Sequence, residues 1–347
     1  MIPLSSSAHY LSPSEAAERL GISQKALRLY ERRSLLSPVR TAAGWRTYGP
    51  AEMARAAEIA ALRALGLSLA QVARVLQGDA QGLVPALAAH QKRLEDDIRH
   101  LSATVETVRD LRAGLAGGLP PKMTELARLA RPEAEIAVAF DLPWPWGGER
   151  FELRDIRSLN YIIGPLGSGK TRLAKAIAEH LPGAVFVDLD RGADNAAAAQ
   201  ARMQADPELK ARVEQALHWL AEEGSTPSPD LAALVVAMEA GPQDILVLDL
   251  IEQGLDQATQ EALIGYLRHR ARTARPVFML TRSSAILDLA AVGQDEAIIL
   301  CPANHSPPSR VAPHPGAPGY EAVTTCLASP EVRARTEGVI AWRPQVA

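Results

Sequence analysis

The sequence predicts a multidomain α and α/β protein, with a helical N-terminal part and a C-terminal α/β domain. Three observations lead to this fold class. Short capped helical segments and a candidate hairpin lie within residues 12–48, and an apolar repeat with a period of seven follows over residues 82–118. A glycine-rich loop, Gly164–Thr171, then separates a strand-like from a helix-like segment. The chain has 347 residues, 47% apolar and 22% charged, which is enough for about two or three domains with separate cores.

Composition restricts the class of protein further. No apolar run approaches the roughly 20 residues of a spanning helix and no leader is recognisable, so we expect a cytoplasmic protein without a membrane partner. Cys301 and Cys326 are too few and too far apart for a disulfide framework, and we expect reduced thiols. The net charge is −3, but residues 9–77 carry ten Lys and Arg against five Glu, an excess of +5 that suits a phosphate backbone.

The first predicted domain spans residues 9–80. Residues 12–15, Ser-Pro-Ser-Glu, have the pattern of a capping box with proline at the first helical position, and Gly21 ends that helix. Ser23 is the expected cap of a second helix that runs from Gln24 to about Leu35. Two short helices joined by a tight turn predict a helix-turn-helix, and four side chains of the second helix are expected to be exposed toward a DNA major groove: Gln24, Lys25, Arg28 and Tyr30.

A hairpin and two more helices follow. Residues 40–48 alternate around Gly44 and predict a small β-hairpin, the wing, in which we expect Arg46 and Tyr48 to contact DNA. Residues 49–52 and the capping box at residues 68–71 begin a third and a fourth helix. Together the segments Leu27–Glu31, Gly44–Tyr48 and Leu65–Leu69 resemble the winged helix-turn-helix of MerR-family regulators over about residues 9–115. A small helical domain with an accidental turn is the alternative.

A long helix is predicted for residues 81–118. Its apolar residues fall on two rows with sevenfold spacing, Leu87, Leu94, Leu101, Val108 and Leu115 on one and Val84, Ile98 and Val105 on the other. This pattern predicts a coiled-coil dimerisation helix and a homodimer, and packing against the same chain is the alternative. Because MerR-family regulators pair through such a helix, the resemblance implies a twofold dimer on a pseudo-palindromic site in double-stranded DNA, with RNA polymerase as a candidate partner.

Metal sensing, the expectation for part of that family, is not supported by the cysteine pattern. Residues 77–120 contain no cysteine. A zinc site could be assembled from later residues, but their spacing matches no short ligand motif and prolines separate them: Cys301, His305, His314 and Cys326. We therefore expect a loop at residues 302–318 within a Pro-rich segment and tail, residues 304–347.

The second domain follows a linker at residues 119–134 and spans residues 135–303. Leu159–Ile163 is an apolar strand, and a helix begins at Lys170, so that the loop between them meets the context of a P-loop NTPase α/β sheet. Backbone N–H groups of the loop would enclose phosphate, from Gly164, Gly167, Ser168 and Gly169. Lys170 would neutralise the outer phosphates, and Thr171 with Asp249, at the end of a second apolar strand, would bind Mg²⁺. The sequence thus predicts ATP and Mg²⁺ as cofactors.

The region 136–302 resembles soluble ABC/RecF-like ATPases. The resemblance is carried by Asp249–Asp256 as an acidic tail and D-loop, by Val277–Ser284 as a switch strand and by Ala297–Leu300 as a late core strand. Two departures concern catalysis. Leu250 stands where these enzymes carry a catalytic glutamate, and Arg282 stands where they carry a histidine that senses the terminal phosphate. Hydrolysis is therefore expected to be slow or absent, and Glu252 and Arg282 are the remaining catalytic candidates.

Three local questions stay open at this stage. The segment Gly224–Asp230 lacks the paired glycines of a signature loop, and Ser225 or Ser228 capping the next helix is the simpler interpretation. The strand at residues 184–191 also resembles shikimate-kinase-like enzymes, in which Asp188 or Asp190 would bind an acceptor or Mg²⁺. The simpler alternative is that these acids only end a buried strand. A turn before the P-loop holds two tryptophans that would either stack on adenine or cover the sheet edge, Trp144 and Trp146.

These observations favour one function over two others. We expect a dimeric DNA-binding transcription regulator in which the C-terminal domain senses ATP. The second hypothesis is an enzyme, either an active ATPase or a P-loop small-molecule kinase tethered to DNA. The third is an architectural protein with a vestigial P-loop, which predicts no nucleotide binding.

Overall fold

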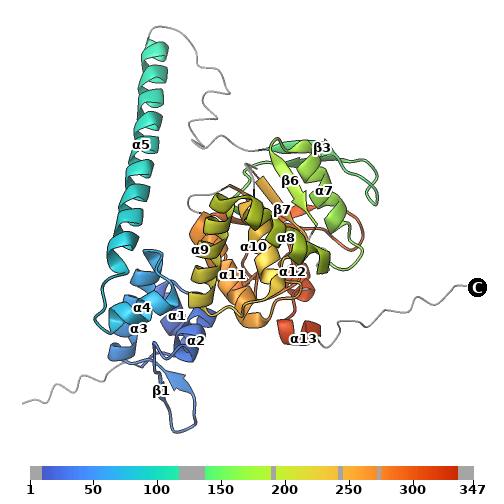
Figure 1. Ribbon diagram of the computed structural model, residues 1–347. Coiled ribbons are helices and arrows are strands. Elements are labelled where there is room, and N and C mark those ends of the chain that lie inside the picture. Colours follow the sequence, from blue (N-terminus) through green and yellow to red (C-terminus); the bar gives the residue numbers. More distant parts are fainter. Residues whose placement is uncertain (1–9, 117–136, 189–192, 241–244, 272–274, 335–347) are drawn as a thin grey trace, which may run out of the picture. The chain divides into compact units, whose positions relative to one another are not determined.

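The computed structural model describes residues 10–116, 137–188, 193–240, 245–271 and 275–334. The chain divides into two compact units, residues 1–134 and 135–347, each of which is treated separately below (Figure 1). The N-terminal unit contains α1 (Pro13–Leu20), α2 (Gln24–Arg32), β1 (Val39–Arg40), β2 (Arg46–Thr47), α3 (Pro50–Ala64), α4 (Leu69–Leu76) and α5 (Leu83–Ala116).

The predicted helix caps of the N-terminal unit are confirmed. The Ser12 hydroxyl accepts from the Glu15 N–H, and the Glu15 carboxylate accepts from the Ser12 N–H at 2.8 Å. Gly21 ends α1 with φ of 65°, a left-handed conformation in which glycine carries no side-chain penalty. Ser68 forms the second capping box, with Gln71.

The second helix ends earlier than expected. Ser23 caps α2 as predicted, through the Ala26 N–H at 3.1 Å, but the helix stops at Arg32 instead of Leu35. Ser34 turns the chain with φ of 55°, and Leu35 and Leu36 then enter the core. The need to bury these two leucines outweighs the helical propensity of the segment.

The wing and the helices surround one hydrophobic core. Strands β1 and β2 pair antiparallel, Val39 opposite Thr47 and Arg40 opposite Arg46, around a turn in which Gly44 has φ of 81°. The core buries side chains from all four short helices and from the wing, among them Leu27, Tyr30, Tyr48, Ile59 and Val72. The predicted helix-turn-helix with a wing is therefore present.

The long helix α5 matches the segment predicted from the heptad pattern. It has 34 residues, which corresponds to about 51 Å at 1.5 Å per residue. Leu83 and Ala86, in its first turns, pack against the N-terminal core. Every apolar residue of the two predicted rows is exposed to solvent, from 37% for Val108 to 73% for Val84.

The C-terminal unit is built on a six-stranded sheet with the order β10-β9-β5-β8-β7-β6. Its strands are β5 (Leu159–Ile163), β6 (Ala184–Val187), β7 (Ile245–Leu248), β8 (Val277–Leu280), β9 (Glu296–Leu300) and β10 (Ser309–Val311). All neighbours are parallel except β10, which pairs antiparallel with β9 at one edge. The register places Asn160 beside Phe278 on β8 and beside Ala297 on β9. This sheet, with a P-loop after β5, is the α/β sheet of a P-loop NTPase.

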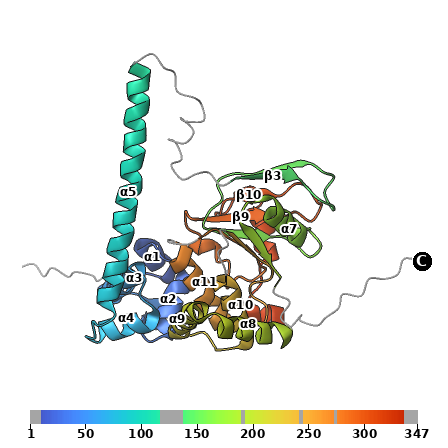
Figure 2. The ribbon, with the colours of Figure 1, turned by 45° about the horizontal axis from the view of Figure 1, so that its top comes forward.

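Alternate residues of these strands enter two separate cores, as the twofold repeat of a strand requires. Tyr161 and Ile163 face one core with α9 (Pro207–Glu223), α10 (Pro229–Glu239) and α11 (Gln257–Ala271). Ile162 faces the other core, with α7 (Lys170–His180) and an antiparallel hairpin of β3 (Val138–Asp141) and β4 (Arg150–Leu153). Figures 1 and 2 show these layers on the two faces of the sheet. A further helix, α8 (Ala193–Ala205), packs against α10.

The prediction of a loop over residues 302–318 is wrong at its centre. Residues Ser309–Val311 form β10, because their backbone completes the edge of β9 and Val311 reaches the core. The segment that follows also contains structure, namely α12 (Tyr320–Cys326) and α13 (Pro330–Ala334). The prolines around Ser309 concealed a strand whose hydrogen-bond partner lies earlier in the chain. The predicted linker at residues 119–134 lies outside the described residues.

Within the parts of the chain that the structure describes, no helix combines the length and the apolar character needed to cross a bilayer.

Candidate nucleotide and DNA-binding sites

The P-loop connects a fully buried strand to α7. Gly167 and Gly169 have φ of 78° and 91°, in the left-handed region where other residues are strained. A Cβ at Gly169 would also lie 2.6 Å from the indole ring of Trp146, and one at Gly164 would collide with the carbonyl oxygen of Cys301. The backbone of the loop is thus held close to its surroundings at both ends. This close approach explains why the sequence needs glycine at these positions.

Lys170 is drawn back onto the loop that precedes it. Its Nζ donates to the carbonyl oxygens of Gly164 and Pro165, each at 2.7 Å. Burial lowers the pKa of Lys170, and the nearby Arg282 guanidinium lowers it further. A phosphate beside these two cations would offset both the desolvation and their mutual repulsion. Arg282 was predicted to lie near the terminal phosphate, and the structure brings it within electrostatic range of Lys170.

The two predicted Mg²⁺ ligands lie together. The Thr171 hydroxyl donates to Asp249 Oδ2 at 3.2 Å. Burial raises the pKa of Asp249 against the effect of this hydrogen bond, and the Asp188 carboxylate raises it as well. Asp249 Oδ1 and the Ser168 hydroxyl are buried with no hydrogen-bond partner among the described residues. Buried oxygens without partners are costly, and Mg²⁺ and phosphate are ligands that would satisfy them. The residues present therefore fit Mg²⁺ and a nucleotide phosphate.

Two positions bear on hydrolysis, Leu250 through its backbone conformation and Glu252 through its contacts. Leu250, which replaces the expected catalytic glutamate, has φ of 44°, in the left-handed region. The carboxylate of Glu252 is buried, accepts from the Arg282 N–H at 3.0 Å and forms an ion pair with Arg333 of α13. Both donors bind Glu252 Oε1, whereas Oε2 is buried with no hydrogen-bond partner among the described residues. The catalytic roles of Glu252 and Arg282 remain predictions, and these contacts favour a structural role for Glu252.

The two tryptophans before the P-loop have different roles. Trp146 is buried, and its indole N–H donates to the carbonyl oxygen of Ser306 at 3.1 Å, so it belongs to the core beneath the loop. Trp144 is 71% exposed and lies against the guanidinium of Arg172, 4.7 Å from the ring centroid. Of the two, only Trp144 presents a ring surface to a ligand. Arg172, on α7, was not identified from the sequence.

The segment 224–230 connects to the D-loop. Ser228 caps α10 through the Leu231 N–H at 3.1 Å, as the simpler interpretation predicted. The Thr226 hydroxyl donates to Asp256 at 2.7 Å, and the Thr226 N–H donates to the Thr259 hydroxyl at 2.9 Å. Burial acts to raise the pKa of Asp256, but hydrogen bonds from Thr226 and Thr259 more than compensate and lower it.

The residues of the kinase hypothesis are only partly described. Asp188 follows β6 with its side chain exposed, and its charge acts on Asp249. Asp190 lies outside the described residues. Cys301 is buried and has a pKa raised to about 12 by that burial, and among the described residues no three His, Cys, Asp or Glu side chains gather as metal ligands.

The predicted DNA-binding residues separate into two groups. Gln24 and Arg28 are exposed on α2 and Lys25 is half-buried there. Tyr30 and Tyr48, in contrast, are 5% and 0% exposed, and both belong to the core. Their prediction as DNA-contacting residues is corrected. Tyr30 follows Leu27 by one helical turn and shares its inward face, and Tyr48, directly after β2, is buried in the same core. Burial, together with a hydrogen bond to Glu31, raises the pKa of Tyr48.

The wing is tied to α2 through one carboxylate. Arg46 Nε donates to Glu31 Oε2 at 2.7 Å, and the Tyr48 hydroxyl donates to Glu31 Oε1. Glu31 is only 12% exposed. Sequence patterns place Glu31 on the second helix but do not show that it binds two residues of the wing. Glu31 thus holds Arg46 of the wing against α2, and both Arg46 and the exposed Arg28 of α2 lie within electrostatic range of Tyr48.

Comparison with known proteins agrees with this N-terminal architecture. Residues 11–79 match the family of MerR HTH regulatory proteins. An uncharacterized HTH-type transcriptional regulator of Pseudomonas aeruginosa is 36% identical over 123 residues, which cover 33% of this chain and 93% of that protein. The N-terminal unit therefore has the class of a helix-turn-helix regulatory protein. Through its N-terminal unit, the chain belongs to the MerR HTH family.

Solved structures give weaker likenesses to each unit. HiNmlR, a MerR family regulator lacking the sensor domain and bound to promoter DNA, is 22% identical with a TM-score of 0.25, over 32% of this chain and 92% of that chain. The SMC head domain from Thermotoga maritima is 13% identical with a TM-score of 0.37, over 51% of this chain and 98% of that chain. Both scores are too low to support a functional argument.

Proposed function

We propose that this MerR-family regulatory protein is a dimeric, DNA-binding transcription regulator whose C-terminal unit senses ATP with Mg²⁺ and hydrolyses it slowly or not at all. The observation that carries the proposal is the cluster of Lys170, Thr171 and Asp249 at a complete P-loop, with Leu250 in the place of a catalytic base. ATP acts in this proposal as a signal, and the protein works in the cytoplasm.

Double-stranded DNA is the proposed ligand of the N-terminal unit. Arg28 is exposed on α2, and Arg46 is fixed on the wing beside it by Glu31. A recognition helix contacts base edges in the major groove, while a neighbouring cation on a wing contacts the phosphate backbone. The excess of positive charge over residues 9–77 supports this surface. RNA polymerase is a candidate partner of the bound regulator.

The dimer is proposed to form through α5. The two apolar rows of this helix are exposed along its length, whereas its first turns already pack on the core. A surface helix with a heptad repeat of apolar residues buries them when a second copy pairs with it. Twofold pairing would place two copies of α2 on a pseudo-palindromic site.

The nucleotide is proposed to bind with its phosphates on the P-loop. Backbone N–H groups of Gly164, Gly167, Ser168 and Gly169 would surround the phosphate oxygens, and Lys170 with Arg282 would neutralise their charge. Thr171 and Asp249 would hold Mg²⁺. Trp144, paired with Arg172, offers a ring on which adenine can stack.

Slow or absent hydrolysis follows from the surroundings of the reacting phosphate. Leu250 has no group that accepts a proton, and Glu252 is buried in contact with Arg333. Arg282 can stabilise charge on a phosphate but cannot act as a general base. The site therefore combines good phosphate binding with no evident activation of water.

An enzyme is the second candidate, and one observation favours it. Asp188 is exposed at the end of β6 and acts electrostatically on Asp249, so a carboxylate stands beside the proposed Mg²⁺ site. A phosphoryl acceptor needs such a group to orient its hydroxyl. A P-loop small-molecule kinase tethered to DNA, or an active ATPase, would use it.

Calorimetry of the full chain with ATP and ADP in Mg²⁺, combined with a phosphate-release assay with and without DNA, tests these functions. We expect wild type to bind nucleotide and Lys170→Ala to lose at least about tenfold in affinity, since a desolvated cation beside phosphate contributes more than about 1.4 kcal/mol. The matched control is Lys210→Ala, which removes an exposed lysine that pairs with Glu214 on the same helix. Rapid turnover would identify an enzyme, and no binding would mean a vestigial P-loop.

A further inference from the structure

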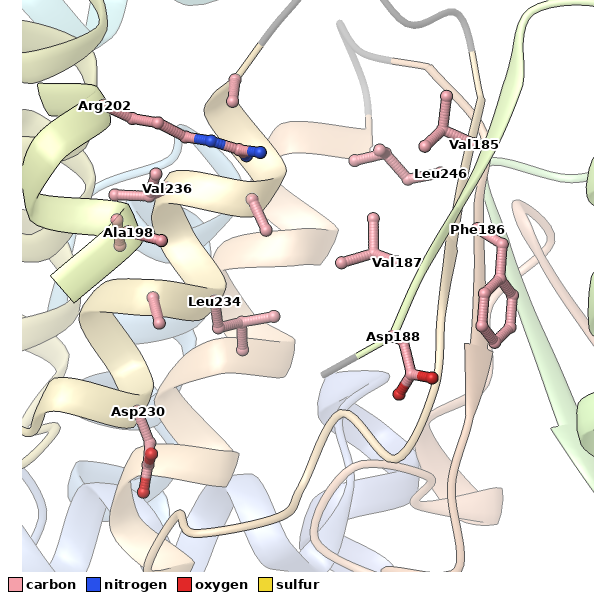
Figure 3. A pocket seen from close by; sticks show the side chains of 14 residues that line it. Val185, Phe186, Val187, Asp188, Ala198, Arg202, Asp230, Leu234, Val236 and Leu246 are labelled. Atoms are coloured by element: carbon pink, nitrogen blue, oxygen red, sulfur yellow. The ribbon is translucent and has the colours of Figure 1, made fainter. Parts of the chain in front are cut away.

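A cavity lies at the edge of the six-stranded sheet opposite β10. It has a volume of about 350 Å³ and lies between the edge strand β6 and the helices α8 and α10 (Figure 3). None of its described lining residues belongs to the P-loop, to the Mg²⁺ pair or to the DNA surface. Apart from Asp188, which the enzyme candidate would use, the proposed function assigns these residues no role.

Small apolar side chains create the space. One wall consists of Val185, Val187 and Leu246 from the sheet. The opposite wall comes from α8 and α10, where alanines stand at positions that a larger residue would fill: Ala198, Ala199, Ala233, Ala237 and Ala240. Binding sites for small molecules are concave and mostly apolar, with a few polar groups that fix the orientation of the ligand.

Among the described residues that line the cavity, three have charged side chains. Arg202 extends from α8 into the opening, while Asp188 and Asp230 lie away from it, at the end of β6 and the beginning of α10 (Figure 3). Within the described part of the chain, the side chains of Arg202 and Asp188 form no ion pair and no hydrogen bond, although the Arg202 carbonyl oxygen accepts from the Asp206 N–H. One end of the cavity is therefore cationic and the other is anionic, with apolar walls between them.

We propose that this cavity binds a small molecule that carries a carboxylate and an ammonium group at opposite ends of an apolar chain, that is, an ω-amino carboxylate. The planar guanidinium of Arg202 matches a carboxylate with two parallel hydrogen bonds. Asp188 and Asp230 provide two carboxylates for the ammonium group, which is a three-donor cation. The apolar walls would cover the chain between the two ends.

The position of Asp188 brings this ligand next to the nucleotide site. The Asp188 carboxylate lines the cavity and also acts on Asp249, a proposed Mg²⁺ ligand. A ligand held there would make the C-terminal unit responsive to a second small molecule. Binding of the ligand does not depend on the proposed nucleotide function, so the two can fail separately.

The test is calorimetry of the full chain without nucleotide, with 6-aminohexanoate as the probe and hexanoate and hexylamine as probes that each lack one charged end. A series of ω-amino carboxylates of about four to ten carbons locates the best length for the cavity. We expect saturable binding of the zwitterion of best length, at least about tenfold tighter than of either single-ended probe, which is about 1.4 kcal/mol.

Variants assign each end of the ligand. Arg202→Gln should reduce binding of the zwitterion to the level of the amine probe and leave the amine unaffected. Asp188→Asn should weaken binding of the zwitterion and of the amine and leave hexanoate unaffected. Ala237→Leu should weaken all probes because it fills the cavity from α10. Lys210→Gln removes a cation of the neighbouring α9 that does not line the cavity and should bind like wild type.

Two results would overturn the inference. If wild-type protein binds no member of the series saturably, the cavity is not such a site. If Arg202→Gln binds the zwitterion as tightly as wild type, Arg202 does not bind the carboxylate. Circular dichroism of each variant checks that it is folded. If Lys170→Ala no longer binds ATP but still binds the probe, the cavity is independent of the P-loop. If wild-type protein binds ATP but not the probe, this inference fails and the proposed function stands.

Discussion

Glu31 of α2 connects that helix to the wing of the N-terminal unit through hydrogen bonds. Its two carboxylate oxygens accept from Arg46 and from Tyr48 of the wing, while its backbone belongs to α2. Because the carboxylate is nearly buried, these bonds are protected from water and hold the wing at a defined position. Arg46 therefore contributes a positioned cation, and Tyr48 contributes packing.

Replacement of Arg46 by alanine should weaken binding to all DNA sequences by a similar factor. If Arg46 contacts a phosphate, the slope of log K against log salt should become shallower by about one unit. Fluorescence anisotropy at several salt concentrations measures both quantities. Arg55→Ala on α3 is the control, since Arg55 is exposed and pairs with Glu58 at 3.3 Å. A loss confined to one base position would instead mean that Arg46 contacts a base.

At the nucleotide site, the Glu252–Arg333 pair carries a second prediction. Glu252 is almost fully buried, so Arg333→Gln would leave its carboxylate without the ion pair. Removing one partner of a buried pair costs on the order of 3 kcal/mol, and Glu252→Gln combined with Arg333→Gln should recover part of this loss. Denaturant unfolding measures the free energies. Equal stability of the single and double variants would contradict the pairing.

Among the elements, α5 exposes two rows of apolar side chains to solvent. Its apolar rows include Leu101, 61% exposed, and Ile98, 62% exposed, on a helix that packs only by its first turns within the described unit. An isolated helix of this kind is stabilised by burying its apolar face. Within the N-terminal unit these rows are uncovered, as the proposed pairing with another copy requires.

If the proposed dimer forms through α5, Leu101→Glu should convert it to a monomer at micromolar concentration and weaken binding to a pseudo-palindromic site. The introduced charge would be buried in the pair without a partner, at a cost of several kcal/mol. Light scattering gives the mass. Ser102→Glu adds the same charge at the adjacent exposed position, outside the rows, and should remain dimeric. A wild-type protein that is itself monomeric would show that α5 does not mediate dimerisation.

For the whole molecule, the open question is whether the two units communicate. We propose that bound nucleotide changes the angle between the two DNA-binding heads of a dimer through α5. Such a change requires that ATP bind the two states with different affinities. The same coupling free energy must then appear in both directions, so that operator DNA alters ATP affinity by the factor by which ATP alters DNA affinity.

The prediction is that DNA affinity differs among the nucleotide-free, ADP and ATP forms, by about five- to 150-fold if the coupling is of ordinary size. Fluorescence anisotropy with each nucleotide in Mg²⁺ measures it, and Lys170→Ala should bind DNA equally in all three conditions. Identical DNA affinity of wild type in the three forms would rule out nucleotide sensing through the DNA heads.

The sequence by itself determined the features that depend on near neighbours in the chain. Helix caps at Ser12, Ser23 and Ser68, the wing around Gly44 and the P-loop between strand and helix all follow from hydrogen bonds and backbone conformations within a few residues. The heptad rows likewise predicted the length of α5. Local chemistry is sufficient for these features because both partners of each contact are visible in one short pattern.

Only the tertiary structure decided which side chains are buried and which distant ones meet. It placed Tyr30 and Tyr48 in the core, although both are compatible with a DNA surface in sequence. It also paired Glu252 with Arg333, and it completed the sheet with β10. These contacts join segments far apart in the chain, and their free energy comes from burial and desolvation that no local pattern records. Packing against remote segments thus decided the chemistry available to each residue.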